Sequence, residues 1–320
     1  MLKKPHKIAL GIILMLTSYS FIIYKIIHFE DLQYFSFTTL YSFPAVLLLA
    51  LVFLLMVLNW SLESIKWKIL IGDIQKINFF YALKAVFSGI TIGIFTPNRV
   101  GEIGGRILFL NKGNRTFGVL ATSLGSFAQI ITTLTLGILG FIIFLIKFPE
   151  KAFINPILNS GSAVICSLIL LFLVWTFFNI KKITPILNKV SFFRNRESQL
   201  NYFTETKFNV LIKSLFLSFI RYAVFSTQFY LLLLLFDVQI TITQAYISIS
   251  LIYLFATLIP TTTLIELGIR GSLAIFFIGM FSENILGITF STFIVWFINL
   301  AIPSIIGSVF FIKNKFDISN

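Results

Sequence analysis

Residues 117–146 read FGVLATSLGSFAQIITTLTLGILGFIIFLI, thirty residues without a charged side chain. A helix needs about 20 apolar residues to cross the hydrocarbon core of a bilayer. The whole chain has the same character: 58% of its 320 residues are hydrophobic and 12% are charged, with a mean hydropathy of +0.96. Soluble domains carry roughly 25% charged residues, and disordered chains are poor in aromatic and branched apolar residues. The composition therefore excludes both classes and predicts an all-α polytopic membrane protein, with residues 1–320 forming one integral membrane domain.

Five further segments resemble this stretch in length and hydropathy, which gives about six full spans: residues 8–27, 44–62, 157–180, 214–236 and 284–312. Residues 117–146 and 284–312 exceed the thickness of the hydrocarbon core, so we expect these two helices to tilt or kink. Three shorter apolar stretches lie next to Pro97 or Pro260: residues 79–96, 245–259 and 267–281. Short hydrophobic pieces interrupted by proline are typical of discontinuous helices. The sequence therefore predicts two broken or re-entrant helical segments in addition to the full spans.

A short motif occurs once in each half of the chain. Residues 97–106 read PNRVGEIGGR and residues 260–270 read PTTTLIELGIR, and both contain Glu-apolar-Gly-x-Arg. The order of elements around each motif also matches: two spans, the broken segment and a long span. The halves, about 1–148 and 149–320, are therefore predicted to form an inverted repeat, as in many secondary transporters. Proline ends a helix and glycine permits a turn or close packing, so a structural role is predicted for Pro97, Gly101, Gly104, Gly105, Pro260 and Gly268.

The charged side chains of these motifs are the candidate functional residues. A bare charge near the bilayer centre costs about 2.5–3.5 kcal/mol, and Glu and Arg four residues apart lie on one helical face. Arg221 lies in the middle of an apolar segment, and we expect Glu102, Glu266 or a ligand phosphate to be its partner. The predicted substrate-binding residues are Arg99, Glu102, Arg106, Arg221, Glu266 and Arg270. The alternative is that these groups form only structural ion pairs.

The excess of basic residues is explained by membrane topology. The chain has 25 Lys and Arg against 12 Asp and Glu, a formal net charge of +13. Basic residues concentrate at the amino terminus, in residues 63–116 and 181–213, and at the carboxyl terminus. By the positive-inside rule both termini are predicted to be cytoplasmic, and no nucleic-acid partner is predicted. With one cysteine, Cys166, and two distant histidines, no metal, cofactor or catalytic residue is predicted.

At the two motifs the chain resembles the membrane domain of lysylphosphatidylglycerol synthetases and the stand-alone flippase-like proteins of that superfamily. The residues that carry the resemblance are Thr96-Pro97, Gly101-Glu102 and Arg106 in the first motif, and Pro260 and Glu266–Arg270 in the second. The resemblance implies a bacterial or archaeal plasma membrane. It also implies the movement of lipids, such as aminoacylated phosphatidylglycerol, between leaflets. Since no polar segment of domain size is present, synthesis of such a lipid is not implied.

Three functions remain open from the sequence. The first is a lipid translocase whose arginines hold an anionic, phosphate-bearing headgroup, since arginine suits bidentate phosphate contacts. The second is a membrane-embedded transferase acting on a lipid phosphate, with Glu102 or Glu266 as general base. The third is a membrane assembly factor without transport activity. The expected partners are membrane lipids, and the sequence predicts no particular oligomeric state.

Overall fold

The computed structural model describes residues 20, 42–96, 99–151, 156–183, 202–203, 205–259 and 263–319. Within these ranges the regular secondary structure is entirely helical, which confirms the predicted all-α polytopic fold class. Five stretches are long and apolar enough to cross a membrane. They correspond to all or part of α2 (Phe43–Leu70), α5 (Arg115–Lys147), α6 (Pro156–Phe178), α9 (Phe208–Leu235), and the consecutive helices α12 (Ile285–Trp296) and α13 (Ile302–Ser319). They match five of the six predicted spans, and the sixth, residues 8–27, lies outside the described residues except for residue 20.

Of the two predicted spans that are longer than the hydrocarbon core, one is a continuous helix and the other is interrupted. The helix α5 is continuous over 33 residues, roughly 50 Å at 1.5 Å per residue, against a hydrocarbon core of about 30 Å. The other span is interrupted by a π-helical turn, Phe297–Ala301, between α12 and α13. Pro303 gives the physical reason, because its ring would clash with the carbonyl of Asn299 four residues earlier in a regular helix. Such turns are frequent at functional sites.

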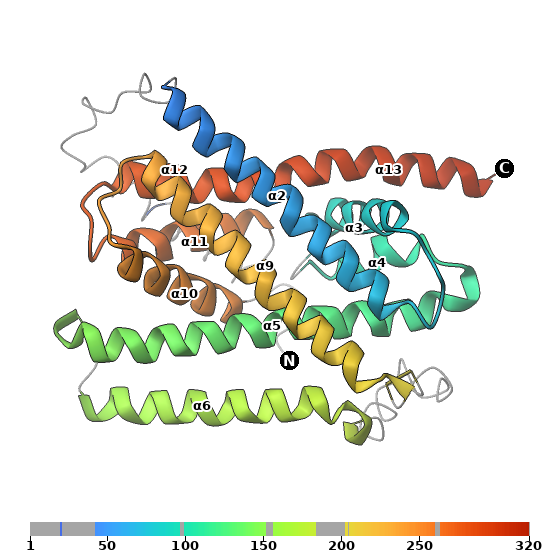
Figure 1. Cartoon of the computed structure of the whole chain (residues 1–320), viewed down its shortest axis with the longest axis horizontal. Helices are drawn as coiled ribbons and strands as arrows, with labels where there is room; N and C mark the ends of the chain where they lie inside the picture. The colour runs from blue at the N-terminus through green and yellow to red at the C-terminus, as the bar shows by residue number, and fades with distance from the viewer. Residues whose placement is uncertain are drawn as a thin grey trace.

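The predicted broken segments are two pairs of short helices. The first pair is α3 (Phe79–Gly93) and α4 (Gly101–Ile107), and the second is α10 (Ile242–Leu258) and α11 (Thr263–Ile278). In Figure 1, where the long helices α5, α6 and α12–α13 run horizontally, α3 and α4 lie in the right half and α10 and α11 in the left half. The two pairs therefore enter the bundle from opposite ends. Pro97 and Pro260, predicted to break these segments, lie outside the described residues.

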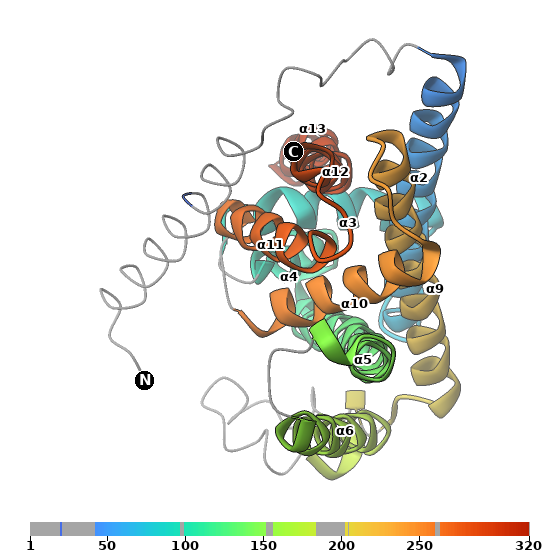
Figure 2. The ribbon, with the colours of Figure 1, turned by 90° about the vertical axis from the view of Figure 1, so that its left-hand side faces the viewer.

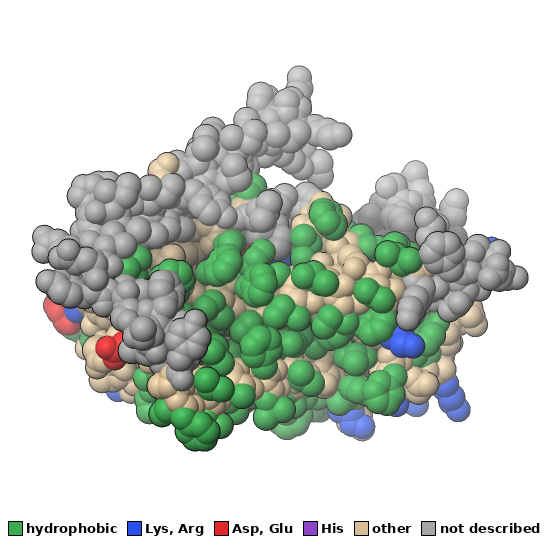
Figure 3. Space-filling model, turned by 90° about the horizontal axis from the view of Figure 1, so that it is seen from above, with side chains coloured by type: hydrophobic (Ala, Val, Ile, Leu, Met, Phe, Trp, Pro, Cys, Tyr) green, Lys and Arg blue, Asp and Glu red, His purple; other side chains and the backbone are tan. Residues whose placement is uncertain are grey.

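The long helices lie on different sides of these short pairs. Seen from the end of the bundle, α2 and α9 lie side by side along one flank, and α6 lies beside α5 at the edge (Figure 2). Hydrophobic side chains cover the middle of the surface in Figure 3, with Lys and Arg toward the right-hand end and Asp and Glu at the left. The basic end carries Lys68, Lys112, Arg115, Lys181, Lys182, Lys207 and Lys213, and the opposite end Lys147, Glu150, Lys151, Asp237 and Glu283. An apolar middle with basic residues concentrated at one end is typical of a bundle that spans a bilayer and exposes its two ends to different compartments.

The helices α3 and α4 cross so closely that glycine is required at their contact. A Cβ atom on Gly105 would lie 2.6 Å from the Cα atom of Gly89 and 2.7 Å from the carbonyl oxygen of Ser88. Both neighbours are backbone atoms, which have no flexible side chain to move. By contrast, a Cβ atom on Gly104 would have no atom within 4 Å. Packing therefore explains Gly105 but not Gly104, although both glycines were expected to be structural.

We expect Gly105→Ala to lower the free energy of unfolding by about 1–3 kcal/mol, the usual cost of overpacking a well-packed contact. Gly104→Ala, one residue away on the same helix, should be neutral or stabilising, since alanine favours helix more than glycine. Thermal unfolding of both purified variants in detergent measures the difference. Equal stability of the two variants would contradict the close α3–α4 contact.

Candidate functional site

The helix α2 carries a buried charged face that the sequence prediction missed. The predicted span 44–62 stops before Glu63, but α2 continues to Leu70. Glu63 and Lys66 are only 4% and 1% exposed, so residues 63–70 are not part of a loop. The predicted boundary was wrong because the charges of these two residues are compensated inside the bundle and do not end the helix.

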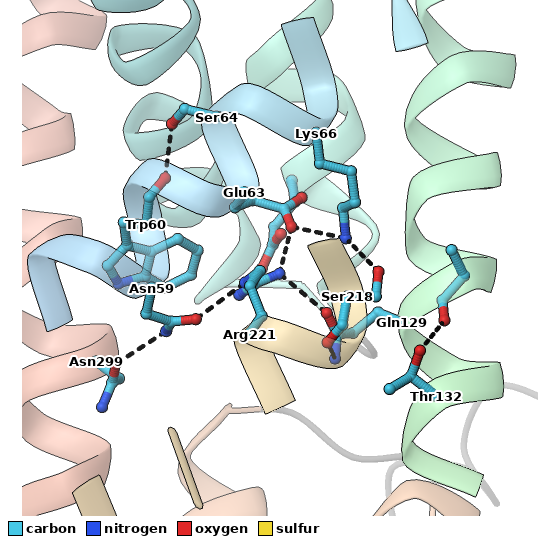
Figure 4. Close-up of polar contacts among 12 residues, drawn as sticks. Asn59, Trp60, Glu63, Ser64, Lys66, Gln129, Thr132, Ser218, Arg221 and Asn299 are labelled. Carbon is cyan, nitrogen blue, oxygen red and sulfur yellow. Dashed lines mark hydrogen bonds and ion pairs between the residues drawn. The ribbon is translucent and has the colours of Figure 1, made fainter. Parts of the chain in front are cut away.

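Glu63 is the centre of a buried cluster of charges. Its Oε1 accepts a hydrogen bond from Nη1 of Arg106 at 2.7 Å, and its Oε2 lies 2.8 Å from Nζ of Lys66. The same Oε2 accepts a hydrogen bond from Nη1 of Arg221 (Figure 4). One carboxylate thus joins three cations from α2, α4 and α9. Lys66 also donates a hydrogen bond to Oγ of Ser218 at 3.1 Å.

A chain of side-chain amides leads from this cluster to the π-helical turn. Nε of Arg221 donates to Oδ1 of Asn59 at 2.9 Å, and Nδ2 of Asn59 donates to Oδ1 of Asn299 at 3.1 Å. Nδ2 of Asn299 in turn donates to Oε1 of Gln228 at 3.2 Å. Oε1 of Gln129 on α5 accepts a further hydrogen bond from Arg221 at 3.3 Å. Partners on two other helices, α2 and α5, thus fix the orientation of the Arg221 guanidinium.

A second group of charges joins the two repeated motifs. Nη2 of Arg99 lies 2.8 Å from Oε2 and 3.1 Å from Oε1 of Glu266, and Glu266 also pairs with Arg270 at 2.5 Å. Arg99 has a positive φ of 55°, a left-handed conformation uncommon for residues other than glycine. The two motifs therefore meet through Arg99 and Glu266. Within each motif the Glu and Arg four residues apart, expected to share one helical face, form the ion pairs Glu102–Arg106 and Glu266–Arg270.

Both glutamates expected as partners of Arg221 were wrong. Neither Glu102 nor Glu266 reaches it; its carboxylate partner is Glu63. A sequence signal for this pairing did exist, because Asn59, Glu63 and Lys66 are spaced by four and three residues and so share one face of a helix. Three polar residues on one helical face at the end of an apolar run are compatible with the end of a membrane span. They are equally compatible with a helix that continues and buries a polar face.

A cavity of about 240 Å³ lies between the Glu63 cluster and the motif contact, and Arg99, Arg221 and Arg270 all line it. Glu102 and Arg106 do not line the cavity. They pair with each other on α4, and Arg106 also links α4 to α2 through Glu63. Three lining residues carry buried N–H groups without a hydrogen-bond partner: Nε1 of Trp60 and Trp296 and Nε of Arg270. Among the described residues, no three His, Cys, Asp or Glu side chains come together as metal ligands. The described residues that line the cavity include three arginines and three side-chain amides, Asn59, Gln129 and Asn299, and no carboxylate.

An apolar helical bundle with charged groups paired at its centre defines a multi-pass integral membrane protein. The family model of the lysylphosphatidylglycerol synthase transmembrane region matches residues 8–307, nearly the whole chain. The chain therefore belongs to this family, whose members include the membrane part of an enzyme of lipid-headgroup chemistry. No curated protein matches the chain.

Proposed function

We propose that this protein binds the phosphate-bearing headgroup of a membrane lipid in the central cavity and moves the lipid between leaflets. The observation that carries the proposal is the convergence of Arg99, Arg221 and Arg270 on one cavity inside an apolar bundle. The side chains of Asn59, Gln129 and Asn299 line the same cavity and carry amide N–H groups. A phosphate offers only acceptor oxygens at neutral pH and matches such a lining.

The balance of buried charge supports an anionic ligand. Five cationic side chains meet three carboxylates in the two groups of charges: Lys66, Arg99, Arg106, Arg221 and Arg270 against Glu63, Glu102 and Glu266. Each cation contacts a carboxylate, but carboxylates are shared, so the two groups together carry a net charge of +2. Uncompensated charge is costly inside a membrane, so an anion that enters the cavity is stabilised there. Arginine also offers the planar fork that binds phosphate through two parallel hydrogen bonds.

The arrangement of the helices supports transport. The two short helix pairs enter from opposite ends and meet through Arg99 and Glu266, so we interpret the halves of the chain as an inverted repeat. In such proteins the substrate binds where the repeats meet. We further propose that the protein lies in a plasma membrane, with the basic end of the bundle and both termini in the cytoplasm. The transferase alternative gains no support, because Glu102 and Glu266 are each paired with arginine and neither is a free base.

The proposal is tested by reconstituting the protein into liposomes that contain a trace of fluorescent phosphatidylglycerol. A membrane-impermeant quencher added outside removes fluorescence only from lipids that reach the outer leaflet. We expect the quenched fraction to rise with the amount of protein, above the level of protein-free liposomes. An unrelated multi-pass protein, reconstituted at the same molar ratio, controls for disturbance of the bilayer by helices alone. Quenching no greater than in that control would refute translocation.

A further inference from the structure

We propose that a groove between α5, α6 and α9 binds an acyl chain of an anionic phospholipid, whose headgroup lies at the basic end of the bundle. This lipid site is separate from the central cavity, because no described residue lines both. On α5, Gln129 and Thr133 line the central cavity, whereas Thr132 and Leu136 line the groove. The inference therefore does not depend on the proposed function.

The groove arises from the angle between α9 and α6. The two helices meet near the basic end, where the ring centres of Phe178 and Phe208 lie 5.3 Å apart. Beyond this contact α9 runs obliquely away from α6, which stays beside α5 (Figures 1 and 2). The groove that lies between α6 and α9, over α5, measures about 430 Å³.

The lining of the groove suits hydrocarbon. Nine of its eleven residues are hydrophobic, and the hydroxyl groups of the other two, Thr132 and Thr135, donate to carbonyl oxygens of their own helix. Water enters the interior of a protein where it finds about two to four polar partners, and a lining of this kind does not supply them. In a bilayer an acyl chain is therefore the suitable occupant, because it makes dispersion contacts along the whole groove.

The groove opens sideways toward lipid. Leu139, Phe216 and Phe219 form its rim and are exposed, whereas Ile131 and Thr132 form its floor and are buried. All of these residues lie on helices that are long and apolar enough to cross a membrane. A chain can therefore enter the groove directly from the bilayer, without passing through the bundle.

The charges at one end of the groove favour an anionic headgroup. Among the described residues from 171 to 219, the acid Glu205 is outnumbered by four exposed lysines: Lys181, Lys182, Lys207 and Lys213. Lys213 directly follows Ile212 of the groove, and Lys207 directly precedes α9. The start of α9 has no side-chain cap, and the amino-terminal end of a helix attracts anions. Basic residues beside a membrane also attract anionic lipids, so headgroup and chain can be held together.

The test measures which lipids the purified protein retains. The protein is equilibrated in detergent with equal amounts of phosphatidylglycerol and phosphatidylcholine of identical acyl chains, and bound lipid is counted by native mass spectrometry. We expect phosphatidylglycerol to be retained in preference. Leu136→Trp, which enlarges a side chain inside the groove, should retain one phosphatidylglycerol fewer per chain. Leu134→Trp is the matched control, because Leu134 is also partly buried on α5 but lines neither the groove nor the central cavity.

Lys213→Gln tests the headgroup without altering the packing of the groove, since Lys213 is exposed. We expect it to lower the preference for phosphatidylglycerol over phosphatidylcholine about fivefold, the contribution of one basic residue near an anionic lipid surface. Lys147→Gln, at the opposite end of α5, should leave the preference unchanged. Thermal unfolding of all four variants without added lipid identifies any that lose their fold.

The outcomes separate this site from the other possible occupants and from the proposed function. Retention of phosphatidylglycerol by Leu136→Trp at the level of the Leu134→Trp control would overturn the inference. If the same spectra show a dimer that only Leu136→Trp dissociates, with lipid retention unchanged, the groove is an interface between two copies of the chain. Lipid that Arg270→Gln loses but Leu136→Trp retains would lie in the central cavity alone, which contradicts the groove site and leaves the proposed function intact. Equal effects of Lys213→Gln and Lys147→Gln would contradict the headgroup position.

Discussion

Replacing Glu63 with glutamine should destabilise the protein more than the same replacement at Glu102 or Glu266. Glutamine keeps the shape of the side chain but removes the charge that Lys66, Arg106 and Arg221 share. Removing one partner of a buried ion pair costs about 3–5 kcal/mol, because the remaining charge is left uncompensated. We expect a loss of at least this size in the free energy of unfolding, measured as thermal or denaturant unfolding in detergent.

Glu102→Gln is the matched control for this prediction. Glu102 is 19% exposed and has one ion-pair partner, Arg106, which keeps its contact with Glu63 in the variant. We expect a loss of about 1 kcal/mol or less, in the range of partly exposed pairs. Equal losses in the two variants would show that Glu63 is not the common partner of the three cations.

The second large effect is expected at Arg270, where alanine should abolish lipid transfer while the protein stays folded. Arg270 lines the cavity, and its Nε has no partner. Its loss leaves Glu266 paired with Arg99 through both carboxylate oxygens, so no buried carboxylate becomes isolated. Arg270→Lys should restore only part of the activity, because an ammonium group keeps the charge but lacks the planar fork.

Arg221→Ala provides the contrast, because Arg221 belongs to both the cavity and the Glu63 cluster. This variant should lose lipid transfer and thermal stability together. Liposome transfer measured beside detergent stability distinguishes the two cases. Full activity in a stable Arg270→Ala variant would remove Arg270 from the proposed headgroup site. If Arg270→Ala instead lowers thermal stability as much as Arg221→Ala does, Arg270 has a structural role.

The parts of the fold that the sequence predicted follow from two simple physical requirements. Long apolar runs must become helices in a bilayer, because every backbone polar group needs a partner there, and this gave the five spans the structure describes. Charges inside such runs must be paired, and the four-residue spacing of Glu and Arg in each motif agrees with the ion pairs Glu102–Arg106 and Glu266–Arg270. Both requirements can be applied to a single sequence without knowledge of its tertiary structure.

The parts that the sequence did not predict depend on contacts between distant helices. Hydropathy treats Glu63 and Lys66 as the end of a span, although inside the bundle they pair with each other and Glu63 also pairs with two arginines on other helices. The partner of Arg221 lies 158 residues earlier in the chain, and no local pattern encodes that distance. The π-helical turn that places Asn299 next to Asn59 was likewise not predicted, since Pro303 alone indicates a distortion but not its form.

The position of Lys66 three residues after Glu63 has a consequence for biogenesis. The chain is made from its amino terminus, so α2 is complete before its other partners exist: Arg106 follows Glu63 by 43 residues and Arg221 by 158. At translation rates of roughly 5–20 residues per second, the second interval lasts on the order of ten seconds to half a minute. During this time Lys66, on the same helix, can neutralise Glu63, so α2 can enter the bilayer without net charge on this face. The later arginines then join an ion pair that is already in the membrane.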